Sequence, residues 1–417
     1  MWRALILVLY LLDEIISKQL PVSSGTYAVA LLLLVWRNHP LKVSSRRLTR
    51  FAGGVAVLLV AGACGGVMSG TPVGAFFLMT LGLLSMLWLM GTTNPIHLQL
   101  ITPQAAFAGL LISAIFLWIS RLVGLDAFAL LTGDIPSRPA GLFAEPSHLA
   151  LYLVPLAAIA WVRAPNRRWI ALLWVVLAVG AFSLTLVFTT LLVMAIAAWA
   201  EQPKDRFQKR RLVTFVLALP LVAGSLSLLS VGDVPVIDYV SSRLGGLAIE
   251  GDDDTHNISS LVVLQGFDLA QESFTASRGM GVGVGNLGTS PELVKDNIYR
   301  DILNTLLPNA ADINLRDGAL LANKIVGEFG IFALMLLWAL FTGLRRLRRL
   351  SDSATKRYHA AFLATAVSLI AIRALPYFAA PTCLAIVSMA ALASPKRVQS
   401  GTTGKAGGLF REPLKGA

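Results

Sequence analysis

The chain alternates long apolar blocks with short polar stretches along most of its length. Each block holds about 15 to 25 residues, and about 20 apolar residues suffice for a helix to cross the hydrocarbon core of a membrane. We therefore expect an all-α fold, a polytopic transmembrane helical bundle of about 12 spans. The spans are predicted at residues 2–16, 22–36, 51–69, 73–91, 103–124, 148–163, 168–181, 183–200, 212–231, 318–343, 358–374 and 378–394.

Composition favours a membrane protein over a soluble one. Hydrophobic residues make up 56% of the 417 residues and charged residues only 14%, whereas a soluble domain carries roughly 25% charged residues. Asp13 and Glu14 follow the first apolar block, where a cleavable signal peptide would need small residues. We therefore interpret that block as a first membrane helix. Cys64 and Cys383 both lie inside apolar blocks, so no disulfide framework is expected.

The net charge of +12 is concentrated in a few polar segments. These basic segments alternate with loops that are short, neutral or acidic, which is typical of cytoplasmic and external loops in membrane proteins. A nucleic-acid partner is therefore not expected, and both termini are predicted to be cytoplasmic. The basic segments are residues 37–50, 163–168, 204–211 and 345–357 and the tail from residue 396.

The predicted spans divide the chain into membrane helices and two external loops. The larger loop is acidic and too long for a simple connection, so we expect it to fold in part, with short amphipathic helices along the membrane surface. The parts are N-terminal membrane helices (1–124), an external loop (125–147), central membrane helices (148–231), the large external loop (232–317), C-terminal membrane helices (318–394) and a basic tail (395–417).

Ionisable side chains at membrane depth are costly and are functional candidates by default. Arg121, Asp13 and Glu14 lie at the outer ends of predicted spans, where charged side chains can also reach the headgroups without any further role. Lys324 and Glu328 are four residues apart on one helix, so they can form a structural pair or serve a site.

A functional role is favoured more strongly for Arg373 than for these residues. It is followed by the segment PYFAAP, whose prolines should break the helix and open a cavity.

The segment SRPAGLFAEPSH joins the first external loop to the sixth predicted span. Pro146 suits the first position of a helix, which places Ser147 and His148 in a first turn whose free N–H groups can bind an anion such as phosphate. Arg138 offers the forked cation that grips diphosphates, and Glu145 is a carboxylate suited to base chemistry. The alternative is a capped helix in which Arg138 and Glu145 form a surface pair.

This segment resembles the R-x-x-G-x-F-x-E-P-S signature found in a branch of the Wzy-type O-antigen and capsule polymerases. These enzymes belong to the O-antigen ligase and polymerase superfamily. Three weaker similarities support the resemblance: the Ser/Thr-rich helix start at 183–185, the G-x-G-x-G-N turn at 279–286 and the E-x-G step at 328–331. Together they cover the chain from about Arg121 to Ala374.

The sequence also departs from the family pattern. His148 directly after Glu-Pro-Ser is not expected, and Ser259 and Ser260 lack the arginine that often follows a serine in the large loop. Arg243 and Arg278 are the loop arginines that remain. The glycine-rich turn formally matches a dinucleotide fingerprint, but we interpret it as a tight turn that lets backbone approach a ligand or a neighbouring helix.

The resemblance implies a glycosyltransferase that joins undecaprenyl-diphosphate-linked oligosaccharide repeat units on the external face of the bacterial inner membrane. Its substrate would be that lipid-linked oligosaccharide, in contact with membrane lipid, and a chain-length regulator protein would be a partner. No cofactor and no metal are expected. The implied catalytic residues are Glu145 and Arg138, the implied diphosphate-binding residues are Arg138, Ser147, Arg243, Arg278 and Arg373, and the implied supporting residues are His148, Lys324 and Glu328.

Two alternatives remain open from the sequence. An O-antigen ligase, which transfers finished polymer to lipid A core, shares the architecture and differs in its acceptor. A transporter or flippase for lipid-linked oligosaccharides would show inverted repeats and charges that reach both faces. The polymerase is favoured by the Glu-Pro-Ser segment and by charges that gather on one side. The acidic residues 252–254 suggest a solvated loop more than a cation site.

The predicted sidedness can be tested by cysteine labelling. With Cys64 and Cys383 replaced by alanine, Asp252→Cys in the large loop should react with a membrane-impermeant maleimide in intact cells. Ser400→Cys in the tail should react only after the membrane is permeabilised. Labelling of position 252 only after permeabilisation would contradict the predicted topology.

Overall fold

The structure of the chain is a computed structural model. The described residues are 2–19, 26–38, 45–69, 73–90, 100–134, 138–163, 167–181, 183–201, 258–283, 285–288, 298–306, 318–350 and 352–393. The predicted span 212–231, Arg243, the acidic residues 252–254 and the basic tail lie outside them. Within these ranges the chain forms helices and turns and no strand, so the all-α prediction is confirmed.

The helices follow the predicted apolar blocks closely. The first half contains α1 (Trp2–Gln19), α2 (Thr26–Asn38), α3 (Ser45–Ser69), α4 (Val73–Met90), α5 (Pro103–Val123), α6 (Ala127–Thr132), α7 (Pro146–Arg163), α8 (Arg167–Ala181) and α9 (Leu184–Glu201). The second half contains α12 (Ile258–Ala276), α14 (Ile298–Leu306), α15 (Leu321–Phe329), η4 (Gly330–Phe332), α16 (Ala333–Leu347), α17 (Ser353–Ala371) and α18 (Ala380–Ala393).

Two helical stretches in the described part are long and apolar enough to cross a membrane. They are Pro103–Val123 and Leu321–Leu347. The second was predicted as one continuous span, but a 3₁₀ turn at η4 divides it, because Gly330 adopts a positive φ of 55°. The remaining apolar helices are shorter, so the number of spans stays a prediction.

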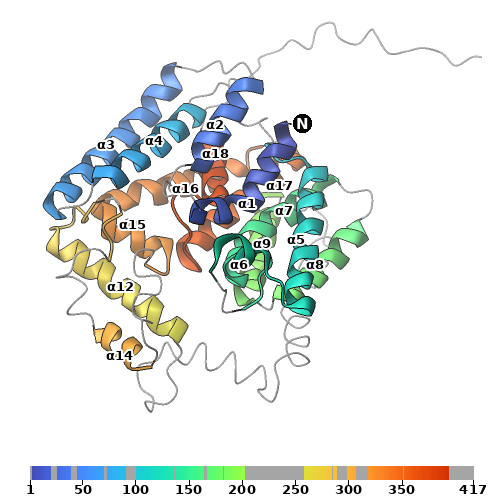
Figure 1. Cartoon of the computed structure of the whole chain (residues 1–417). Helices are drawn as coiled ribbons and strands as arrows, with labels where there is room; N and C mark the ends of the chain where they lie inside the picture. Colours follow the sequence, from blue (N-terminus) through green and yellow to red (C-terminus); the bar gives the residue numbers. More distant parts are fainter. Residues whose placement is uncertain are drawn as a thin grey trace, which may run out of the picture.

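α17 lies at the centre of the bundle and packs against α7, α9, α16 and α18. Small residues on α17 permit this close packing, and Ala360, Ala361 and Ala364 are all 0% exposed. Small residues at helix interfaces are typical of membrane bundles, where close backbone approach drives association. Figure 1 shows α3 and α4 on one side of this core and α5 and α8 on the other.

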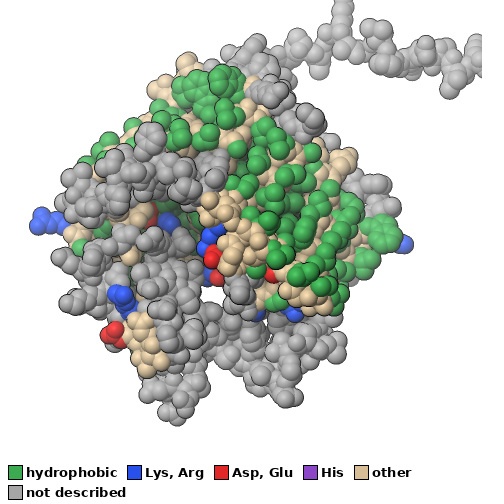
Figure 2. Space-filling model, viewed as in Figure 1, with side chains coloured by type: hydrophobic (Ala, Val, Ile, Leu, Met, Phe, Trp, Pro, Cys, Tyr) green, Lys and Arg blue, Asp and Glu red, His purple; other side chains and the backbone are tan. Residues whose placement is uncertain are grey.

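The outer surface of the bundle carries many large apolar side chains. Trp36, Leu122, Trp169 and Trp338 are each more than 60% exposed, at 65%, 77%, 61% and 67%. Figure 2 shows hydrophobic side chains covering broad continuous areas of one face. Exposed apolar areas of this extent mark contact with a membrane or with another protein.

The glycine-rich turn after α12 packs directly on the break between α15 and α16. The N–H groups of Val282 and Gly283 donate to the carbonyls of Gly327 and Glu328 at 2.9 and 3.0 Å. Ile331 N–H donates back to the Gly279 carbonyl at 2.9 Å. The predicted tight turn is confirmed, and its neighbour is a helix break.

Glycine is required where these two backbones meet. A Cβ on Gly330 would lie 2.0 Å from the Gly279 carbonyl oxygen, and its φ of 55° disfavours any other residue. Gly330→Ala should therefore destabilise the protein by at least about 2 kcal/mol and lower its melting temperature in detergent. Gly53→Ala is the control, because a Cβ there meets nothing within 4 Å. Equal melting temperatures for both variants would show that the turn does not dock on the break.

Candidate functional site

The loop that carries the Arg/Glu-Pro-Ser segment is organised by one aspartate. Asp126 caps α6 by accepting hydrogen bonds from the backbone N–H groups of its first turn. Its Oδ2 also accepts from Ser120 Oγ at 2.6 Å and from the N–H groups of Ala140 and Gly141 at 3.3 and 3.1 Å. We call residues 138–145 the strap. Asp126 ties this strap to the end of α5.

The middle of the strap is anchored in the core. Gly141 has a φ of 72°, and a Cβ there would lie 2.8 Å from the backbone nitrogen of Leu117 on α5, so only glycine fits. Phe143 is 0% exposed and its ring packs 5.0 Å from the ring of Tyr152. These contacts fix the position of Glu145 at the start of α7.

α7 begins as the sequence predicts. Pro146 is its first residue, and Ser147 and His148 lie in its first turn. The Glu145 carbonyl accepts the first helical bond, from Leu149 N–H at 3.0 Å. Ser147 Oγ donates to Glu145 Oε2 at 2.9 Å. The helix start is therefore well ordered around a carboxylate.

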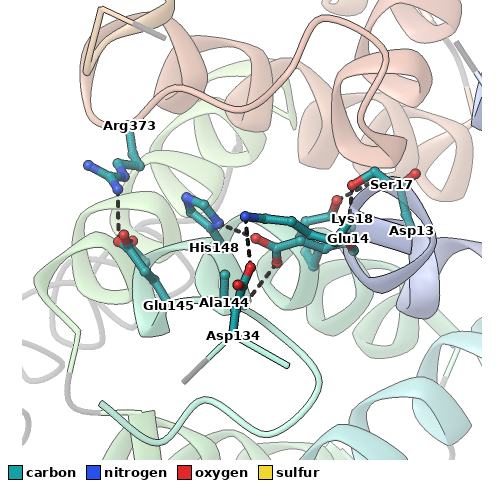
Figure 3. A network of polar contacts seen from close by, with 11 residues as sticks. Asp13, Glu14, Ser17, Lys18, Asp134, Ala144, Glu145, His148 and Arg373 are labelled. Carbon is teal, nitrogen blue, oxygen red and sulfur yellow. Dashed lines mark hydrogen bonds and ion pairs between the residues drawn. The ribbon is translucent and has the colours of Figure 1, made fainter. Parts of the chain in front are cut away.

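The carboxylate of Glu145 forms an ion pair with Arg373, which lies far along the sequence. α17 ends at Ala371 and α18 begins at Ala380, so the helix breaks at the predicted PYFAAP segment. Arg373 Nη2 donates to Glu145 Oε2 at 2.8 Å, with side chains 17% and 37% exposed. Figure 3 shows this ion pair joining the strap to the break. Both residues were predicted as site residues from the sequence, but their pairing was not.

Opposing effects set the acidity of Glu145. Burial alone would raise the pKa of its carboxyl group. The charge of Arg373 acts in the other direction, as do the charge of His148 in its protonated form, the hydrogen bond from Ser147 and the charge of Arg138. The result is a pKa below the ordinary value of 4.5, so Glu145 is held as an anion.

A second pair of polar side chains lies beside the first. Glu14 Oε1 lies 2.5 Å from His148 Nδ1, and Glu14 Oε2 accepts from Ala144 N–H at 3.2 Å. The His148 and Glu14 side chains are only 16% and 12% exposed. From its position in the chain, Glu14 was expected only to end a span. Because 134 residues separate the partners, no spacing in the chain indicates the contact.

Asp13, next to Glu14, locks α1 into the bundle. It is 8% exposed, and its Oδ2 accepts from Tyr152 Oη at 2.7 Å and from Ala380 N–H at 2.8 Å. Tyr10 Oη donates to the Tyr152 carbonyl at 2.9 Å. These buried bonds join α1, α7 and α18 and hold Glu14 in place. The predicted headgroup role for Asp13 does not fit its burial.

Lys324 and Glu328 both contact the side chain of Tyr377. Glu328 is 0% exposed, and its Oε2 accepts from Tyr377 Oη at 2.7 Å. Lys324 Nζ lies 4.9 Å from the centroid of the same ring. Tyr377 belongs to the PYFAAP segment, so this group supports the loop that carries Arg373.

The other arginines that were predicted for the site make fewer contacts with Glu145 and Arg373. Arg138 is exposed and reaches Glu145 through its charge, and Arg121, also exposed, feels the charge of Arg138. Arg278 lies between α12 and the glycine-rich turn, with a positive φ of 51°. In the described part of the chain, no hydrogen bond links it to the Glu145–Arg373 pair. Arg243 lies outside the described residues.

Charged side chains are visible in a hollow near the middle of one face (Figure 2). No group of three or more metal-binding side chains occurs in the part of the chain that the structure describes. The groups gathered at the strap and the α17–α18 break are arginines, carboxylates, a histidine and a helix start.

No protein-family model and no curated protein matches the chain. The resemblance to the Wzy-type polymerases therefore stays a prediction that depends on the strap and on the weaker segments.

The Glu145–Arg373 pair should make stability depend on pH. The lowered pKa of Glu145 means that its stabilisation is present above the ordinary value of 4.5 and is lost as pH falls through the lower, folded-state value. Glu145→Gln should lower the melting temperature near neutral pH, and this difference should shrink as the pH falls below 4.5 and vanish once the pH is below the folded-state value.

The control for this measurement is Asp134→Asn. Asp134 pairs with Lys18 at 3.0 Å, but both side chains are more than half exposed, so its loss should change little at any pH. A difference between Glu145→Gln and the native protein that does not shrink as the pH falls below 4.5 would contradict the stabilising role of the carboxylate.

Proposed function

We propose that this protein is a glycosyltransferase of the bacterial inner membrane that joins undecaprenyl-diphosphate-linked oligosaccharide repeat units on the external face. The observation that carries this proposal is the Arg373–Glu145 ion pair at the start of α7, with Arg138 within electrostatic range. It brings cations, a carboxylate and a helix N-terminus to one place. A sugar bound to a lipid diphosphate needs these groups.

The diphosphate is the leaving group, and negative charge builds on it as the sugar departs. Arg138 and Arg373 can neutralise that charge, because each carries a guanidinium, the forked cation that matches phosphate oxygens. The backbone N–H groups at the start of α7, that of Ser147 among them, add further donors. Because the diphosphate already activates the sugar, the reaction requires no nucleotide.

Helix lengths support the proposed sidedness. α17 has 19 residues, so it spans about 28 Å between the basic segment at its start and Arg373 beyond its end. α7 has 18 residues, about 27 Å between Glu145 and the basic loop after Arg163. Both lengths are close to the hydrocarbon thickness of about 30 Å. With the basic segments in the cytoplasm, as the positive-inside rule predicts, this spacing would place the site outside.

The donor in this proposal is the growing polymer on its lipid carrier, and the acceptor is a single lipid-linked unit. A hydroxyl of the acceptor attacks the anomeric carbon of the donor, and the lipid diphosphate leaves. The exposed apolar faces of the bundle would hold the polyprenyl tails in membrane lipid. A chain-length regulator protein would limit the number of cycles.

Substitutions at the cluster test this function. Arg138→Ala and Arg373→Ala should abolish long polysaccharide chains while the protein still inserts and accumulates, because each removes charge neutralisation worth about 10²- to 10³-fold in rate. Arg373→Lys should retain part of the activity, since it keeps the charge and loses the fork. Chain length is read from a polysaccharide gel of a complemented deletion strain.

Lys18→Ala is the matched cation control. Lys18 is 54% exposed and forms a surface pair with Asp134, so its loss should leave chain length unchanged. Normal chains in both arginine variants would refute the proposal. Full-length chains that accumulate on the lipid carrier, without transfer to lipid A core, in the deletion strain would identify a ligase instead.

A further inference from the structure

Glu145 is poorly placed to accept a proton. Ser147 and Arg373 both donate to the same oxygen, Oε2, at 2.9 and 2.8 Å. A carboxylate held this way is stabilised as an anion and is a weak base. The attacking hydroxyl in the proposed transfer therefore needs another proton acceptor nearby.

His148 has the geometry of such an acceptor. Its Nδ1 lies 2.5 Å from Glu14 Oε1. Because a carboxylate can only accept, Nδ1 carries the proton in the neutral ring and Nε2 presents a lone pair. Within the described residues, Nε2 makes no hydrogen bond. Figure 3 shows the ring between Glu14 and the Glu145–Arg373 pair.

Glu14 is itself held firmly enough to orient the ring. Its second oxygen accepts from Ala144 N–H in the strap at 3.2 Å. The adjacent Asp13 is buried and bonded to α7 and α18. Glu14 therefore fixes both the position and the tautomer of His148, as an orienting carboxylate does for a catalytic histidine.

We propose that His148, oriented by Glu14, is the general base of the transfer, and that Glu145 positions Arg373. This inference rests on the function proposed above and deepens it. His148 Nε2 takes the proton from the acceptor hydroxyl as its oxygen forms a bond to the anomeric carbon. The bond from that carbon to the diphosphate oxygen breaks, and its electron pair leaves with the diphosphate beside Arg373. The imidazolium then returns its proton to water.

The charges around His148 bear on its pH dependence. Glu14 on α1, Glu145 on the strap and Arg373 on the α17–α18 break are the charged groups that act on it. A base of this kind works only when unprotonated, so the transfer rate should rise with pH and then level off.

The test uses the full-length protein in proteoliposomes. The probe for turnover is the lipid-linked saccharide extracted from cells that lack this protein, and the probe for binding is undecaprenyl diphosphate. His148→Asn keeps a donor to Glu14 and removes Nε2. Glu14→Gln keeps the hydrogen bonds but donates to Nδ1, so the proton moves to Nε2 and the base is lost.

Both variants should lower the initial rate about 100-fold or more, and the remaining rate should lose the rise with pH. Binding of undecaprenyl diphosphate should be unchanged. Ser17→Ala is the control on α1, because Ser17 Oγ donates to the Glu14 backbone carbonyl, at 2.9 Å, and not to its carboxylate. This control should keep the native rate.

Native rates and a native pH profile in either His148→Asn or Glu14→Gln would overturn the inference while leaving the proposed function intact. A rate lowered equally at every pH would also overturn it, because that result indicates a purely structural role. If the native protein neither elongates the extract nor binds undecaprenyl diphosphate, the proposed function fails, and this inference fails with it.

Discussion

The arrangement of this protein depends on one ion pair between segments far apart in the chain. Glu145 ends the strap, Arg373 lies on the break between α17 and α18, and 228 residues separate them. Each is held by its own framework: the strap by Asp126 and Phe143, and the break by the Tyr377–Glu328 bond. The ion pair joins the two frameworks, so the proposed sugar transfer depends on its geometry.

Other polar side chains near this ion pair are buried, and hydrogen bonds within the helical bundle compensate their burial. Asp13 is buried, but two hydrogen bonds compensate its desolvation and join three helices. Glu14 and His148 pair beside it, which leaves one imidazole nitrogen directed away from the carboxylate. Burial of this kind is expensive unless every member is bonded. The hydrogen bonds of Asp13, Glu14 and His148 therefore serve both the packing of the helices and the proposed catalysis.

Much of the fold could be predicted from the sequence, because long apolar blocks specify helices by themselves. The break at PYFAAP, the helix start at Pro146 and the glycine turn were also predicted, since proline and glycine act locally. The pairings of Glu145 with Arg373 and of Glu14 with His148 were not, because nothing in a single sequence records which distant segments pack together. The break at Gly330 was missed for the same reason: the glycine-rich turn that packs against it belongs to a distant segment of the chain.

The ion pair itself is tested most directly by a double-mutant cycle. Melting temperatures would be compared for Glu145→Gln, Arg373→Gln and the double variant, in one detergent at neutral pH. If the two side chains interact directly, the double variant should be scarcely less stable than either single variant, because the bond is lost only once. Destabilisations that simply add would show that Glu145 and Arg373 act independently, which would contradict an ion pair that joins the strap to the helix break.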